Sequence, residues 1–334
     1  MDTLINNVKI KKQFYKNIDG TFKIDKEGNK LPKKPLSDNS IKQYKTNFLR
    51  VAGQCPLDDL SWLCETEPIM ERLNQFKLSN STKKNYLNAI IVILQANEPD
   101  LKSLPDFIRI RDEFNKKYNV DNATGVISDK QKDNFITKKE FDNMVQMQLK
   151  EYKLRLAQKT PQQSDLRNLY QTYLILELYK EFPLRNELAS LKRINNIEYK
   201  KLKDDEKKDN YLVQWKTKME LHLNNYKTDG TYGRKILKVP NKIMKLINYW
   251  ITTYNNREYL FIQRGDQPLS NNNLTKLLTR ASNYLIGKNI STTMIRKIYA
   301  SDKYAKKNEE QKEDADMMGH STETQNKIYV KKPE

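Results

Sequence analysis

The chain has few of the residues that build metal sites and covalent cross-links. Its 334 residues include two cysteines, Cys55 and Cys64, and two histidines, His222 and His320. Two cysteines without a CxxC motif exclude a disulfide framework and a cysteine zinc site, and two histidines exclude a histidine-rich metal centre. No apolar run approaches the ~20 residues of a membrane span, and the first residues lack the apolar core of a signal peptide. We therefore expect an intracellular protein that crosses no membrane.

Positive charge, in contrast, is in excess. The chain has 61 Lys and Arg against 42 Asp and Glu, which gives a net charge of +19. Such an excess points to a polyanionic partner, of which nucleic acid is the simplest. An AT-rich genome, whose codons enrich lysine, is the alternative explanation. A basic membrane-surface helix is disfavoured, because no segment sets a Lys/Arg face opposite a Trp/Phe/Leu face.

Length and turn signals predict two domains and an N-terminal arm. Residues 1–35 are rich in lysine and contain two glycine turns, which predicts a small hairpin or a disordered arm. Residues 36–118 have helical periodicity and predict a small all-helical domain, to which the resemblance described below assigns DNA binding. Residues 119–136 are polar and predict a linker, after which residues 137–334 form the second domain.

The second domain is predicted to be mainly helical with a small antiparallel sheet. Thr137 and Glu140 form the T-x-x-E pattern of a helix-capping box. The predicted strands, with alternating apolar residues, are 211–215, 220–224 and 234–239; the predicted helices are 166–179, 184–191, 241–254, 271–286 and 292–304. On the second strand His222 alternates with two leucines, and we interpret it as exposed and non-catalytic.

Two lysines near the start of a predicted helix are candidates for phosphate binding. The helix begins at Asn80 and has Lys83 and Lys84 in its first turn. Cations are unfavourable there because the helix N-terminus already carries partial positive charge. A phosphate docked on that end would relieve the conflict, whereas a solvated lysine pair is the alternative. The lysines that we predict to contact DNA are Lys42, Lys83, Lys84 and Lys138.

Four short motifs occur in order along the second domain. Arg185 follows Pro183 in PLRNELASL, and Lys227 lies at the mouth of a predicted hairpin turn in KTDGTYGRKILKVP. Arg296 lies on a predicted helix, and the Gly-His-Ser motif at His320 is followed nine residues later by Tyr329. Each motif alone is a weak indication of function, so the functional prediction depends on the order in which the four motifs follow one another.

In that order the motifs resemble the active site of the tyrosine recombinase (phage integrase) family. The resemblance covers about residues 36–334. It implies a helical core-binding domain and an α+β catalytic domain that close as a C-shaped clamp around double-stranded DNA. It also implies a site-specific recombinase, an integrase of a viral or mobile element. Such an enzyme is a monomer in solution and a homotetramer on two recombination sites, and it uses no metal or other cofactor.

The resemblance gives a role to each residue of the motifs. Arg185 and Arg296 would hold the scissile phosphate through paired charge-assisted hydrogen bonds, and His320 would donate another. Lys227 would protonate the leaving 5′-oxygen as a general acid. Tyr329 would attack phosphorus and form a 3′-phosphotyrosyl intermediate.

The sequence departs from the family pattern at two positions. Thr293 stands where the family usually has a histidine, and a threonine cannot accept a proton near neutral pH. Glu187 lies two residues after Arg185, whereas the family commonly has its acid three residues after, so its role in orienting an arginine is open. A type IB topoisomerase, which uses the same nucleophile chemistry, and a catalytically inactive DNA-binding relative are the alternative functions.

Overall fold

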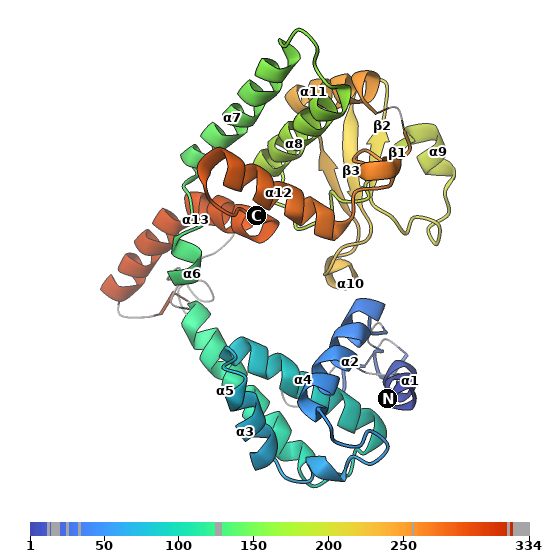
Figure 1. Cartoon of the computed structure of the whole chain (residues 1–334), viewed down its shortest axis with the longest axis vertical. Coiled ribbons are helices and arrows are strands. Elements are labelled where there is room, and N and C mark those ends of the chain that lie inside the picture. Colours follow the sequence, from blue (N-terminus) through green and yellow to red (C-terminus); the bar gives the residue numbers. More distant parts are fainter. Residues whose placement is uncertain are drawn as a thin grey trace. The chain divides into compact units, whose positions relative to one another are not determined.

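A computed structural model describes residues 1–11, 14, 21–24, 27–32, 35–123, 129–255, 257–318 and 321–322. The chain forms two compact units, Met1–Val126 and Ile127–Glu334. Both are built mainly from helices, and the second also contains a four-stranded sheet (Figure 1). The expected fold class, mainly α with a small sheet, is thereby confirmed. Within the described part of the chain, no helix is both long and apolar enough to span a bilayer.

The first unit is a helical bundle around α4. Its elements are α1 (Asp2–Ile10), α2 (Asp38–Ala52), η1 (Ser61–Leu63), α3 (Glu67–Gln75), α4 (Asn80–Asn97) and α5 (Leu104–Ala123). Leu87, Ile90 and Ile93 of α4 are fully buried, and α2 and α5 pack against this helix. Serine side chains cap two of the helices: Ser37 accepts a hydrogen bond at the start of α2, and Ser79 does so at the start of α4.

The ends of this unit differ from the sequence expectation. Residues 1–35 include the helix α1, which packs on α4 through Ile5 and Val8 and whose Asn7 side chain donates to Asn97. The expectation of a hairpin or a disordered segment was therefore wrong for residues 2–10, whereas Ile24 and Lys30 form an antiparallel bridge around the predicted turn at Gly28. The expected linker 119–136 is also partly helical, because α5 continues to Ala123 and α6 follows at Asp129–Lys132.

The second unit sets helices against a mixed sheet. Its strands are β1 (Lys192–Asn195), β2 (Tyr211–Gln214), β3 (Met219–Leu223) and β4 (Lys235–Lys238), in that spatial order. The pairs β2–β3 and β3–β4 are antiparallel, as expected, but β1 pairs with β2 in parallel. The helices are α7 (Lys138–Leu156), α8 (Gln163–Glu181), α9 (Asn196–Lys201), α10 (Asp229–Tyr232), α11 (Asn241–Thr253), α12 (Asn271–Ile286) and α13 (Thr292–Met317), with the short turn η2 (Arg264–Asp266).

The core of the second unit lies around α8. Its residues Leu174, Ile175 and Leu178 are fully buried, and α7, α11 and α12 pack against it (Figure 1). The predicted capping box is confirmed at the start of α7, where Thr137 and Glu140 exchange hydrogen bonds between side chain and backbone. This packed layer forms a fixed base for the segment that follows α8.

Two local expectations in this unit were wrong. Residues 184–191 form turns rather than a helix, because Leu188 and Leu191 are fully buried in the core and the backbone bends to place them there. His222 is buried rather than exposed, with 6% of its surface accessible. The face of β3 that carries it is covered by Tyr199 of α9 and by Trp215, whose rings contact the imidazole.

Candidate active site

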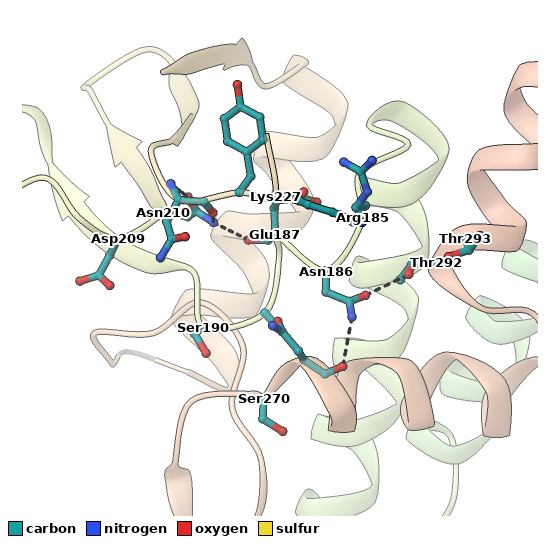
Figure 2. A pocket seen from close by; sticks show the side chains of 14 residues that line it. Arg185, Asn186, Glu187, Ser190, Asp209, Asn210, Lys227, Ser270, Thr292 and Thr293 are labelled. Carbon is teal, nitrogen blue, oxygen red and sulfur yellow. Dashed lines mark hydrogen bonds between the residues drawn. The ribbon is translucent and has the colours of Figure 1, made fainter. Parts of the chain in front are cut away.

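A polar cavity of about 670 Å³ opens at the edge of the second unit, where the chain leaves α8 (Figure 2). It is bounded by the turn after α8, the start of β2, the loop after β3, and the first residues of α12 and α13. The lining residues used below are Arg185, Asn186, Glu187, Asn210, Lys227 and Thr293. Segments that lie far apart in the sequence therefore place cationic and amide side chains around one opening.

The turn that carries Arg185 is held firmly to the core. The hydroxyl of Tyr179, in the last turns of α8, donates a 2.5 Å hydrogen bond to the carbonyl of Arg185. Leu188 and Leu191 are fully buried just beyond it. The Arg185 side chain is partly exposed at the cavity. A guanidinium on such a fixed backbone is pre-organised to bind an anion.

Glu187 places a carboxylate at the same opening. Its Oε2 atom is buried and has no hydrogen-bond partner among the residues that the structure describes. A buried carboxylate oxygen without a partner is costly. It is therefore suited to accept a hydrogen bond from a cationic side chain or from a ligand that enters the cavity.

Lys227 projects from the loop between β3 and α10 and is exposed. The sequence predicted a simple hairpin turn here, but the short helix α10 (Asp229–Tyr232) occupies the connection. The connection is closed by a 2.6 Å hydrogen bond from the Tyr226 hydroxyl to the carbonyl of Gly233, whose φ of 66° suits glycine. The lysine thus lies at the cavity on an exposed loop.

The first turn of α13 forms the remaining wall. Ser291 caps this helix, and the buried Thr292 hydroxyl donates a 2.9 Å hydrogen bond to Oδ1 of Asn186. Thr293 is exposed and lines the cavity. Arg296 does not line it, but it lies three residues after Thr293 and so on the same side of the helix, one turn further.

The predicted site residues are therefore brought together in part. Arg185, Glu187, Lys227 and Thr293 share the cavity, and Arg296 lies one helical turn from it. His320 and Tyr329 lie outside the described residues. Two cavity residues that the motifs did not indicate, Asn186 and Asn210, connect these segments through side-chain hydrogen bonds. The sequence could not indicate these two asparagines, because the hydrogen-bond partners of an amide side chain are determined by the fold.

The lysines predicted to bind DNA differ in their surroundings. Lys42 is exposed, whereas Lys83 donates to the side-chain oxygen of Asn74 at 2.6 Å and Lys84 donates to that of Asn115 at 3.2 Å. Lys138 is ion-paired with Asp142 at 2.6 Å. The hydrogen-bond partners of Lys83 and Lys84 among the described residues are neutral amides, which leave their charges uncompensated. The carboxylate of Asp142 is shared between Lys138 and Lys180, which lies 3.2 Å away, so it offsets the charge of Lys138 in part.

No group of three or more potential metal-ligating side chains occurs among the described residues. No known family profile matches the sequence, and no curated protein matches it either. Among solved structures, the chain is similar to XerA recombinase, with 12% identity over 80% of this chain and 77% of that one and a TM-score of 0.32.

It is also similar to XerH site-specific recombinase in two states. One is the pre-cleavage complex bound to difH substrate, with 16% identity over 89% of this chain and 76% of that one and a TM-score of 0.43. The other is the post-cleavage complex bound to a palindromic difH substrate, with 14% identity over 80% and 68% and a TM-score of 0.40.

Proposed function

We propose that the protein is a site-specific DNA recombinase that cleaves and rejoins strands through a 3′-phosphotyrosyl intermediate. The observation that carries the proposal is the shared cavity of Arg185, Lys227 and Thr293, which come from three of the four ordered motifs. A further motif residue, Arg296, lies on the same side of α13 as Thr293. This arrangement provides cationic donors for a phosphodiester.

The chemistry assigned to the cavity is a balanced exchange at phosphorus. The Tyr329 hydroxyl gives its proton to solvent or to His320, and its oxygen forms a bond to phosphorus while the bond from phosphorus to the 5′-oxygen breaks. Arg185, Arg296 and His320 bind the non-bridging oxygens, where negative charge grows in the transition state. The ammonium of Lys227 gives its proton to the leaving 5′-oxygen. The reverse reaction, with a 5′-hydroxyl of another strand, rejoins the DNA without an added energy source.

The partner implied by this chemistry is double-stranded DNA with a specific site. The net charge of +19 and the uncompensated Lys83 and Lys84 suit a polyanion. We propose that both units contact DNA and that four copies assemble on two sites to exchange strands. Integration of a viral or mobile element is the biological role that best suits such an enzyme.

Covalent capture tests the proposal directly. A nicked suicide site, built from the junctions of the encoding element, should trap the wild-type protein on DNA in a denaturing gel. Tyr329→Phe should abolish the adduct and leave binding intact, whereas the control Tyr304→Phe should leave the adduct unchanged, since Tyr304 is 45% exposed on α13. Absence of any wild-type adduct would favour an inactive DNA-binding protein.

A second assay separates the recombinase from a topoisomerase with the same chemistry. The wild-type protein should join two DNA molecules that carry the site and should give products of strand exchange. Relaxation of supercoiled DNA by the monomer, without exchange between sites, would replace the proposed function with a type IB topoisomerase.

A further inference from the structure

The side chain of Asn210 connects two walls of the cavity. Its Oδ1 atom accepts hydrogen bonds from the backbone amides of Asn224 at 3.0 Å and Asn225 at 2.9 Å. Its Nδ2 atom donates to the carbonyl of Asn225 at 2.9 Å and to that of Glu187 at 3.3 Å (Figure 2). One amide thus joins the loop that leads to Lys227 with the turn that carries Arg185.

These four bonds use the full capacity of an asparagine amide, which has two acceptor sites and two N–H donors. An aspartate at this position would keep both acceptor bonds but would set a carboxylate against two carbonyl oxygens. The main chain of Asn210 is itself fixed, because its carbonyl accepts a hydrogen bond from the amide of Lys192 at the start of β1. Asn210 is therefore a rigid support rather than a movable side chain.

The two walls depend on this support to different degrees. The Arg185 turn has its own anchors, namely the Tyr179 hydroxyl and the bond between Asn186 and Thr292. The loop after β3 takes three of the four side-chain bonds of Asn210, whereas the turn takes one. Its other anchors are the 2.8 Å bond from Asn224 to the carbonyl of Asp209 and the ring of Tyr226, which is buried in the core and lies 4.7 Å from the Lys235 ammonium of β4. Loss of the Asn210 amide should therefore displace Lys227 more than Arg185.

We propose that Asn210 is a positioning residue, which holds the Lys227 loop so that the ammonium reaches the leaving oxygen of a phosphate bound by Arg185. This inference rests on the proposed function, and it adds a residue that acts through Lys227 without touching DNA. The proton still passes from the Lys227 ammonium to the 5′-oxygen as the bond to phosphorus breaks. Asn210 changes only the distance over which that transfer occurs.

The test compares two substrates that differ in their need for a general acid. One is the suicide site with the natural 5′-oxygen at the scissile phosphate, and the other has a bridging 5′-sulfur. A thiolate leaves without protonation, so a variant impaired only in proton transfer is slow on oxygen and normal on sulfur. For Asn210→Asp we expect cleavage of the oxygen substrate to fall about 10- to 100-fold. Cleavage of the sulfur substrate should stay within about twofold of wild type.

Asn255→Asp is the matched control. Asn255 is buried in the same unit away from the cavity, and its side chain also donates to two carbonyls, those of Tyr259 and Leu260. It should leave the ratio of the oxygen and sulfur rates unchanged, whatever it does to stability. Equal slowing of both substrates by Asn210→Asp, or no slowing of either, would overturn the proposal.

Asn210→Ala provides a second variant, because it removes the four bonds without introducing a charge. It should show the same selective defect, and the defect should vanish when Lys227→Ala is already present. A defect that persists in the Lys227→Ala background would show that Asn210 does not act through the lysine. Failure of the wild-type protein to cleave either substrate would refute the recombinase function itself, a result that does not depend on Asn210.

Discussion

The hydroxyl of Thr292 donates a 2.9 Å hydrogen bond to the side-chain oxygen of Asn186. Asn186 follows Arg185 directly, and Thr292 lies one turn before Arg296 on α13. The bond therefore joins the two segments whose arginines are proposed to hold one phosphate. The Asn186 amide also lies 3.4 Å from the Thr275 hydroxyl on α12, which adds a third element to the same junction.

We expect Thr292→Val, which keeps the shape and removes the donor, to weaken this junction. The half-buried Asn186 oxygen would lose its partner, which costs about 0.5–1.5 kcal/mol in the free energy of unfolding. Covalent capture should slow as well, because the two arginines are no longer held in register. Urea denaturation and capture kinetics measure the two effects, and Thr292→Ser, which keeps the hydroxyl, should restore both. A wild-type capture rate in the valine variant would contradict this role of the bond.

Arg296→Lys should separate charge from hydrogen-bond geometry. A lysine keeps the positive charge but cannot donate two parallel hydrogen bonds to a phosphate. DNA affinity should therefore change little, while the cleavage rate should fall by about 10²-fold or more. Arg280→Lys is the control, since Arg280 is exposed on α12 and does not line the cavity. Equal rates for both variants would argue against a role of Arg296 in the reaction.

The lysines of the first unit should reveal their phosphate contacts in the salt dependence of DNA binding. Each contact contributes about 0.9 to the slope of log affinity against log salt. The double variant Lys83→Ala, Lys84→Ala should weaken binding and flatten the slope by up to about 2. Lys138→Ala should change the slope less, because Asp142, which also pairs with Lys180, already offsets part of the charge of Lys138. Fluorescence anisotropy over a salt series measures both, and an unchanged slope in the double variant would exclude the α4 site.

Buried His222 predicts a loss of stability in mild acid. Burial lowers its pKa from the ordinary value of 6.5, and the nearby Glu220 carboxylate, 3.1 Å away, only partly offsets this effect. Below pH 6.5 the imidazole takes up a proton more readily in the unfolded chain than in the folded protein, which favours unfolding. Neutral His222 therefore makes its full contribution to the free energy of unfolding above pH 6.5. This contribution is lost as pH falls through the lowered pKa of the folded state.

His222→Phe should remove this pH dependence. Phenylalanine has no titratable group and can keep the ring contacts with Tyr199 and Trp215. Urea midpoints measured from neutral pH down to about pH 5 should fall less steeply for the variant than for the wild type. Parallel curves for the two proteins would show that His222 is not the group responsible.

Elements with a strong local signal could be predicted from the sequence, whereas those fixed by distant contacts could not. The periodic apolar residues predicted α8, α11 and α12, and alternation predicted β2, β3 and β4. The turn at residues 184–191 has helix-like leucine spacing, but Ser190 takes a left-handed φ of 53° and bonds to the carbonyl of Leu269. That partner is far along the chain, so no local pattern reports it.

The same reasoning applies to the sheet and the cavity. β1, with the sequence KRIN, is too short and polar to indicate a strand, and it forms by parallel pairing with β2. His222 follows the alternation of an exposed position, yet α9 covers that face of the sheet. Of the residues in the ordered motifs, Arg185, Lys227 and Thr293 line one cavity, and Arg296 lies one helical turn from it. The amides that hold those cations in place became evident only from their hydrogen bonds.

Helix α13 sets a limit on the reach of the chain beyond it. It runs without interruption from Thr292 to Met317, so its end lies about 30 Å along the axis from Arg296. Three further residues span at most about 10 Å, whereas the twelve residues to position 329 span up to about 40 Å. If one phosphate is bound by both Arg296 and His320, as proposed, an earlier end of α13 would shorten the distance that the chain has to return. Tyr329 is nine residues further along the chain than His320, so the proposed position of the nucleophile depends less on the length of this helix.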